Sequence, residues 1–226
     1  MKRVILYGYG QTGKAIFNEL SKKYDVRLVK RNTWLKKRKF SKGEVIILAI
    51  GKLSKLIGKK WKSTYDIRLE ETKKNKKSVE RFARKVKNIN LPIIVLTNNA
   101  DMFERYLRNK LNRKNIFAFG KVLDEKRFSL FLGKKVKVVG YHGLALPVLN
   151  KKNKEDYFKI IKKVDNSLLG SFNKKNLDYI KIAQTFSDNF KEIMISSKEP
   201  KLNEVEKSIL NKFKKKFEED YNRIFE

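Results

Sequence analysis

The sequence contains no cysteine among its 226 residues. Neither disulfide bonds nor thiolate metal sites can hold such a chain together, and no metal site is expected. The first residues do not form a long apolar segment followed by a cleavage site, and no apolar run approaches the length that crosses a bilayer. These absences predict a cytoplasmic protein without membrane contact.

Acidic residues are scarce: 24 Asp and Glu stand against 56 Lys and Arg, for a formal net charge of +32. Such an excess attracts polyanions of any kind, with an affinity that falls as salt rises. The lysines are spread over the whole chain, and no helix-turn-helix, zinc or RNA-binding sheet signature accompanies them. The charge by itself predicts only non-specific contact with nucleic acid.

The first half of the chain alternates short apolar segments with amphipathic ones. Strands are predicted at Arg3–Tyr7, Asp25–Val29, Val45–Ile50, Leu91–Thr97 and Ile116–Gly120. Helices are predicted at about Lys14–Lys23, Ile67–Val86 and Met102–Leu111. Strands that alternate with helices predict an α/β fold with a Rossmann-type, doubly wound parallel sheet, whose ligands lie at the carboxyl ends of its strands.

The first strand is followed by a glycine-rich turn, G-Y-G-Q-T-G, and then by a helix. A strand, a G-x-G-x-x-G turn and a helix form the context of a dinucleotide-binding site, with phosphate at the helix N-terminus. The plainer alternative is a glycine turn in some other α/β protein. The candidate cofactor-binding residues are Gly8, Gly10, Gln11, Thr12 and Gly13.

The second strand ends about twenty residues beyond Gly10, where NAD-binding folds place an acidic residue on the ribose hydroxyls. This chain has Lys30 and Arg31 there. A cation cannot accept those hydrogen bonds but can pair with a 2′-phosphate, so the cofactor would be NAD or NADP, with NADP favoured by these two residues. They are equally well explained as two more cations in a basic chain.

A single stretch, Gly120 to Gly143, carries a carboxylate, an arginine and the only histidine of the chain. Asp124 and Arg127 lie three residues apart on a predicted helix and share one face of it. His142 follows a predicted strand, where its side chain can face a cleft. The alternative is a surface histidine and a solvated ion pair of little energetic weight.

The order G-x-x-L-D-x-x-R-F, strand, G-x-H-G resembles the catalytic domain of the lactate and malate dehydrogenases. In that family the histidine exchanges a proton, the aspartate orients it and the arginine binds the substrate carboxylate. The resemblance implies that His142 and Asp124 are catalytic and that Arg127 binds substrate.

Three further positions follow from the same resemblance. Arg68, with Asn75 seven residues later, matches the family arginine that polarises the substrate carbonyl, and Lys62 stands where the family distinguishes malate from lactate. Asn98 matches the asparagine of the family's T-N-P-x-D, with Asn99 in place of proline. The family has an additional helix and strand before Val45, so the resemblance implies a reduced sheet.

The resemblance also divides the chain. It implies a dinucleotide-binding domain over residues 1–119 and a smaller, mostly helical α+β catalytic domain over residues 120–226. The second domain would contain helices over Ile161–Ile195 and Asn203–Phe225, with about Ser196–Leu202 left of the family's antiparallel strands. Asp178 stands where a family threonine contacts substrate.

The resemblance thus implies an oxidoreductase that transfers a hydride between a nicotinamide cofactor and a 2-oxo or 2-hydroxy acid. The sequence is also compatible with a homo-oligomer. One alternative is a catalytically impaired relative that binds a nucleotide or a partner, because the ribose acid and several strands are missing. The second alternative is a basic nucleic-acid-binding protein on a reused Rossmann scaffold.

Overall fold

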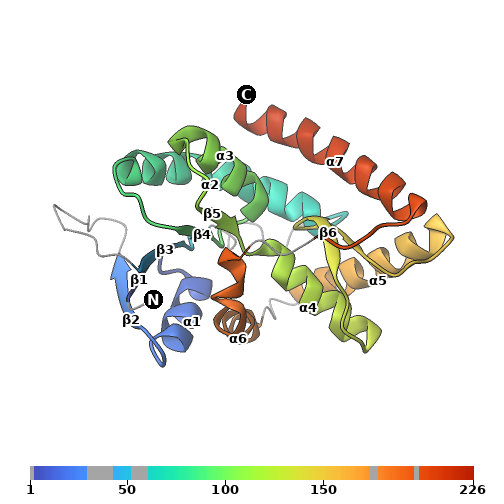
Figure 1. Cartoon of the computed structure of the whole chain (residues 1–226), viewed down its shortest axis with the longest axis horizontal. Coiled ribbons are helices and arrows are strands. Elements are labelled where there is room, and N and C mark those ends of the chain that lie inside the picture. Colours follow the sequence, from blue (N-terminus) through green and yellow to red (C-terminus); the bar gives the residue numbers. More distant parts are fainter. Residues whose placement is uncertain (1–2, 30–42, 52–60, 174–177, 196–198) are drawn as a thin grey trace. The chain divides into compact units, whose positions relative to one another are not determined.

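The computed structural model describes residues 3–29, 43–51, 61–173, 178–195 and 199–226, which form two compact units (Figure 1). Unit 1 takes its described residues from Met1–Lys52, Glu71–Phe119 and Asp178–Ile195. Unit 2 takes them from Leu53–Glu70, Gly120–Leu177 and Ser196–Glu226. One change of unit falls after Phe119, where the sequence placed its boundary, but the two units interleave along the chain instead of following one another.

Unit 1 is built on a parallel sheet with the strand order β2-β1-β3-β4-β5. Its strands are β1 (Arg3–Tyr7), β2 (Asp25–Val29), β3 (Glu44–Leu48), β4 (Ile93–Val95) and β5 (Ile116–Ala118). All residues of β3 and β4 are buried. Their continuous apolar sequences suit a sheet that helices cover on both faces.

Helices cover both faces of this sheet (Figure 1). They are α1 (Gln11–Leu20), the part of α2 (Thr64–Val86) from Glu71 onward, α3 (Ala100–Leu111), α6 (Tyr179–Asn189) and the short 3₁₀ helix η2 (Glu192–Met194). The helices α1 and α6 pack together on one face. The ring of Phe186 on α6 contacts Phe119 edge-on, with centroids 4.9 Å apart. The predicted doubly wound fold is confirmed.

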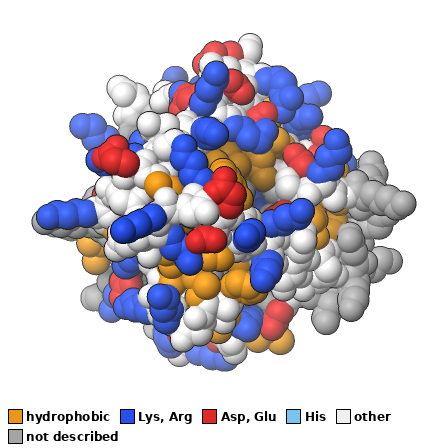
Figure 2. Space-filling model, turned by 90° about the vertical axis from the view of Figure 1, so that its right-hand side faces the viewer, with side chains coloured by type: hydrophobic (Ala, Val, Ile, Leu, Met, Phe, Trp, Pro, Cys, Tyr) orange, Lys and Arg blue, Asp and Glu red, His pale blue; other side chains and the backbone are white. Residues whose placement is uncertain are grey.

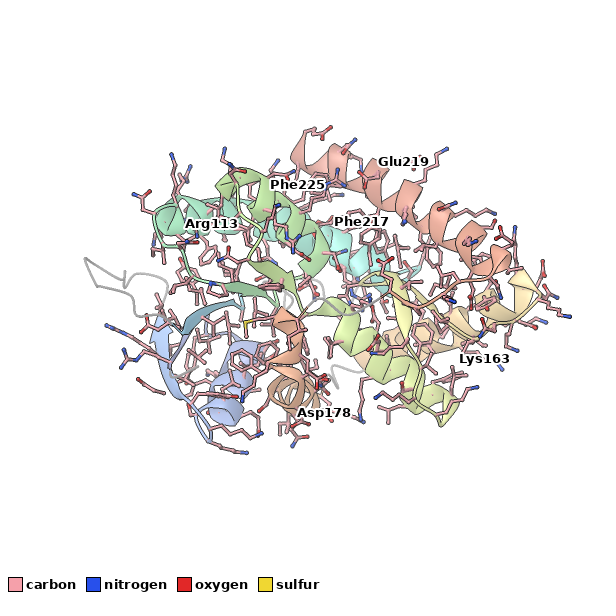
Figure 3. The ribbon with its side chains drawn as sticks, in the orientation of Figure 1. Arg113, Lys163, Asp178, Phe217, Glu219 and Phe225 are labelled. Atoms are coloured by element: carbon pink, nitrogen blue, oxygen red, sulfur yellow. The ribbon has the colours of Figure 1, made fainter. Side chains whose placement is uncertain are left out.

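Arg113, labelled in Figure 3, caps the C-terminal end of α2, which lies in unit 1. Its guanidinium donates hydrogen bonds to the carbonyl oxygens of Val86, Lys87 and Ile89. The last carbonyls of a helix have no partner within the helix, so this arginine satisfies groups that would otherwise require water.

Unit 2 packs three helices on a two-stranded antiparallel sheet. Its elements are α4 (Gly120–Leu132), β6 (Val138–Tyr141), β7 (Leu144–Pro147), α5 (Lys154–Asn173) and α7 (Glu204–Phe225), together with the start of α2, Thr64–Glu70. The sequence did not predict β7, and it predicted a strand near Ser196–Leu202. Residues 199–203 form no strand, and 196–198 lie outside the described residues.

A buried carboxylate fixes the start of α7. Glu206 is fully buried and accepts hydrogen bonds from the backbone of Leu149 and Asn150 and from the Tyr157 hydroxyl, at 2.6–3.0 Å. Phe217, on the same helix (Figure 3), stacks on Tyr141 of β6 with centroids 3.7 Å apart. Within the described residues, no helix is both long and apolar enough to cross a bilayer.

Candidate active site

The lone histidine lies at the tip of the β6–β7 hairpin. The two strands pair up to Tyr141 and Leu144, so His142 and Gly143 form the two-residue connection between them. Gly143 has φ +88°, a conformation that side chains with a Cβ rarely adopt. A Cβ at this position would also lie 2.8 Å from the Arg68 guanidinium. The sequence placed His142 where a side chain can face a cleft; in the structure the residue is buried, with 3% of it exposed.

Asp124 of α4 lies at the centre of a hydrogen-bonded cluster in unit 2. Its Oδ2 lies 2.9 Å from Nδ1 of His142 and accepts from the Gly143 backbone N–H at 3.1 Å. Its Oδ1 accepts from Nη1 of Arg127 at 3.0 Å. Because a carboxylate can only accept, Nδ1 of His142 carries a hydrogen, and Nε2 is left as the basic nitrogen of a neutral ring.

Two opposing electrostatic effects act on this pair. Burial by itself raises the pKa of a carboxyl, but His142, Arg127 and Arg68 outweigh it and hold the pKa of Asp124 well below its usual range. Burial and the Arg68 charge lower the pKa of His142 to about 4, against the opposing attraction of Asp124. By itself the Asp124 carboxylate would favour the imidazolium, but burial and Arg68 outweigh it. In the free protein the histidine is neutral at pH 7.

Arg68 joins the cluster from α2. It is buried, and its Nη1 donates a hydrogen bond to the Thr64 hydroxyl at 2.6 Å. The predicted helix began at Ile67, but α2 begins at Thr64. Ser63 and Asp66 exchange hydrogen bonds at this end of the helix, at 2.8 and 3.1 Å. The S-x-x-D pattern of a capping box was therefore a sequence signal for the earlier start.

A pocket opens beside Arg68 within unit 2. Thr64, Asp124, Gly143 and Asp165 contribute to its wall together with five apolar side chains. The backbone N–H of Thr64 donates to both carboxylate oxygens of Asp165 at 3.1 and 3.2 Å, and the Thr64 hydroxyl donates to the same carboxylate. Sequence reasoning missed Thr64 and Asp165, which lie 101 positions apart.

Gly120 allows α4 to approach the histidine. A Cβ on Gly120 would collide with Cβ and Cγ of His142. We expect Gly120→Ala to destabilise the protein by about 1–3 kcal/mol, as overpacking of a filled interior does. Gly170→Ala is the matched control, because nothing lies within 4 Å of a Cβ at this helical position. It should stabilise the protein by about 0.5–1 kcal/mol. Urea unfolding of both variants measures the difference, and equal midpoints would contradict the predicted clash.

The glycine-rich turn of unit 1 shows which of its glycines the fold itself requires. Gly8 has φ +114°, and a Cβ there would collide with the carbonyl of Ala49, the residue after β3. A Cβ on Gly13 would collide with the Gly8 carbonyl. Gly10 differs, because nothing lies within 4 Å of its Cβ position and its φ is −77°.

This geometry fits a dinucleotide. The space at Gly10 opens at the N-terminus of α1, which begins at Gln11, so Gln11, Thr12 and Gly13 form the first turn of the helix. That end has no side-chain cap and no acidic residue in its first turn. Unpaired N–H groups and the helix dipole favour an anion there. The open position is at the second glycine, where a pyrophosphate would need it.

Asn98 follows β4 in unit 1. Its Nδ2 donates to Oε2 of Glu71 at 2.9 Å, and the Asn99 backbone N–H donates to the Thr72 hydroxyl at 2.8 Å. Because Glu71 is an acceptor when ionised, it fixes the orientation of the Asn98 amide. Glu71 was not among the predicted site residues. Asn75 is fully buried, and neither polar atom of its side chain has a hydrogen-bond partner among the described residues.

Four other residues that the sequence placed near the site make no contact with the Asp124 cluster that the structure describes. Lys30 and Arg31 lie outside the described residues. Lys62 is exposed, two residues before α2. Asp178, labelled in Figure 3, caps α6 by accepting from the Lys181 backbone N–H at 2.8 Å. In the part of the chain that the structure describes, no three His, Cys, Asp or Glu side chains come together as metal ligands.

No protein-family model matches the chain, and no curated protein does. Solved structures match it over its full length. Malate dehydrogenase from Plasmodium falciparum is 15% identical, with a TM-score of 0.74 over 100% of this chain and 99% of that chain. L-lactate dehydrogenase from Clostridium thermocellum is 15% identical, with a TM-score of 0.74 over 100% of both chains. The minor L-lactate dehydrogenase from Enterococcus mundtii is 14% identical, with a TM-score of 0.73 over 99% of this chain and 97% of that chain.

The chain therefore has the fold of the lactate and malate dehydrogenases. The fold that the sequence resemblance implied is confirmed. At identities this low the likeness defines the fold, and any activity has to be argued from the site.

Proposed function

We propose that the protein catalyses reversible hydride transfer between a nicotinamide dinucleotide and a 2-oxo or 2-hydroxy acid. The observation that carries the proposal is the Asp124–His142 pair, buried together with Arg68 and beside Arg127 on a dehydrogenase fold. One of the similar structures is a malate dehydrogenase in complex with NADH. The glycine-rich turn of unit 1 provides space for the same class of cofactor.

The bound dinucleotide would supply or accept the hydride. Gly10 and the first N–H groups of α1 would hold its pyrophosphate. The remaining chemistry belongs to the side chains of unit 2. The Arg127 side chain is 22% exposed and is the more accessible of the two arginines. Its planar guanidinium can bind the substrate carboxylate through two hydrogen bonds.

His142 would move the proton at Nε2. As a neutral ring it can accept the hydroxyl proton of a 2-hydroxy acid, while Asp124 stabilises the imidazolium that forms. In the reverse direction it must hold the proton while negative charge develops on the substrate oxygen, which Arg68 would stabilise. A substrate carboxylate on Arg127 adds a negative charge near the ring. It therefore raises the pKa of His142 above its value in the free protein.

Asn98 and Lys62, which the sequence also predicted as substrate-binding residues, would contact the substrate as well. With its amide nitrogen directed at Glu71, Asn98 presents its carbonyl oxygen as an acceptor, which suits the hydroxyl of a 2-hydroxy acid. Lys62 is exposed and can offer a cation to a second carboxylate, such as that of malate.

The test is a binding measurement with NADH and NADPH, followed by turnover against a panel of 2-oxo acids. If Lys30 and Arg31 meet a 2′-phosphate, NADPH should bind more tightly than NADH at low salt, and the preference should shrink as salt rises. Fluorescence titration at two salt concentrations measures this. Equal affinities at low salt would reject the role of these two residues without affecting the fold.

A pseudoenzyme is the second candidate. The observation in its favour is the low pKa of His142, about 4, which leaves little imidazolium for reduction at pH 7 in the free protein. Dinucleotide binding without turnover of any 2-oxo or 2-hydroxy acid would support it. A binding partner would then have to be sought.

Nucleic-acid binding is a weaker candidate. On the face seen in Figure 2, lysine and arginine side chains are scattered among acidic and apolar ones instead of forming one continuous basic surface. Contact with nucleic acid should therefore be electrostatic and non-specific. Its affinity should fall steeply with salt and show no sequence preference.

A further inference from the structure

Arg68 is a long, charged side chain in the interior of unit 2, with 6% of the residue exposed. A buried guanidinium needs partners that hold both its charge and its orientation. One of these partners is the Thr64 hydroxyl, one helical turn earlier, which accepts from Nη1 at 2.6 Å. The position of Arg68 therefore depends on where the Thr64 hydroxyl points.

Asp165 of α5 determines that direction. A hydroxyl has one hydrogen, and Thr64 donates it to Oδ1 of Asp165, so only its lone pairs face Arg68. The Thr64 backbone N–H donates to both oxygens of the same carboxylate. The carboxylate thus fixes both the first backbone N–H of α2 and the hydroxyl that holds the arginine.

We propose that Asp165 is a positioning residue that holds Arg68 in the site through Thr64, so that the arginine is in place before substrate binds. The network consists of Asp165, Thr64 and Arg68, and all three side chains belong to unit 2. Its catalytic consequence rests on the proposed function. Its structural consequence does not, because it concerns the position of Arg68 in the free protein.

The single histidine of the chain reports that position. Three charged side chains act on His142: Asp124 and Arg127 from α4, and Arg68 from α2. Arg68 opposes protonation of the ring, so a looser Arg68 should raise the pKa of His142. One histidine gives one set of imidazole resonances, and their pH titration can be followed by NMR without assignment.

Thr64→Val removes the hydroxyl and keeps the shape of the side chain. The midpoint of the histidine titration should rise on the order of one pH unit, the scale of a charge interaction that is weakened but not lost. Thr64→Ser restores the hydroxyl and should return the midpoint to that of the wild type. Arg68→Gln removes the charge and should give the largest rise.

Asp165→Asn separates positioning from direct electrostatics by the sign of its effect. Loss of a nearby carboxylate would by itself lower the midpoint of the histidine, whereas release of Arg68 would raise it. We expect a rise. Thr64→Val should add nothing when Arg68 is already glutamine, because the effect acts only through the arginine.

The proposal is wrong if Thr64→Val and Asp165→Asn leave the midpoint unchanged or lower it, or if Thr64→Val shifts it equally with and without Arg68. Circular dichroism confirms that each variant is folded. With a 2-oxo acid, Thr64→Val should reduce kcat/KM about tenfold and leave NADH affinity unchanged. If the wild type shows no turnover, the proposed function fails while the titration still tests the network.

Discussion

Replacement of His142 by asparagine should lower the turnover of a 2-oxo acid by about 10²-fold to 10⁴-fold, the usual contribution of a positioned acid or base. Asparagine has similar bulk and can still donate a hydrogen bond to Asp124, but it cannot deliver a proton. Dinucleotide binding belongs to unit 1 in the proposal, so the NADH affinity should not change. Steady-state turnover and a fluorescence titration on the same preparation measure the two quantities.

Ser129→Ala is a suitable control for this variant. Ser129 also lies on α4, and its hydroxyl accepts a hydrogen bond from the Val136 backbone N–H at 2.9 Å, outside the Asp124 cluster. Its loss should cost some stability and leave turnover near that of the wild type. If both variants lose turnover equally, the effect is structural. If the wild type binds dinucleotide but turns over no acid, the pseudoenzyme takes the place of the dehydrogenase.

The role of His142 can also be tested through the pH dependence of kcat/KM. Reduction needs the protonated ring, so kcat/KM for a 2-oxo acid should rise as the pH falls toward about 4, the pKa of His142 in the free protein. Oxidation of a 2-hydroxy acid needs the neutral ring and should decline over the same interval. Asp124→Asn removes a negative charge beside the ring, lowers the pKa of His142, and should move the reduction profile to lower pH.

Local signals were sufficient for much of unit 1. The strand Asp25–Val29 was predicted at its observed limits, because its valines and its flanking residues are signals within a few positions of one another. The apolar run Val45–Ile50 predicted a strand that the structure has at Glu44–Leu48, with every residue buried. The glycine-rich turn could be recognised because a Cβ at Gly8 or Gly13 would collide with nearby backbone, whereas Gly10 has open space that a ligand could use.

Other features depend on residues far apart in sequence. The start of α2 at Thr64 is reinforced by Asp165 on α5, which no local pattern connects to it. The helix α6 packs against α1 in unit 1, although it lies in the half of the sequence assigned to the second domain. Contacts of this kind come from tertiary packing, which a single sequence does not reveal.

The electrostatics of the site were the hardest part to predict. The spacing of Asp124, Arg127 and His142 indicated which groups could meet, and their contacts are hydrogen bonds of 2.9 and 3.0 Å. The sign of the net effect on the histidine depends on burial and on Arg68, which comes from another helix. A sequence gives the identity of neighbouring charges but not the depth at which they lie.

Replacement of Gly10 by valine should weaken dinucleotide binding by at least about 100-fold, or about 2.7 kcal/mol, while the protein stays folded. Nothing lies within 4 Å of a Cβ at Gly10, and its φ of −77° is open to any L-residue. The added side chain would therefore occupy only the space that the pyrophosphate needs. Calorimetric titration with NADH, together with thermal unfolding, measures both effects.

Gly13→Ala provides the opposite control on the same turn. Its Cβ would collide with the Gly8 carbonyl, so this variant should lose about 1–3 kcal/mol of stability even without ligand. A cofactor site predicts that the two substitutions separate: Gly10→Val affects binding, and Gly13→Ala affects folding. A turn with a purely structural role predicts that neither changes NADH affinity in the folded protein. Full affinity in a folded Gly10→Val variant would therefore show that the dinucleotide does not bind at this turn. The proposed hydride donor would then have no site in the protein.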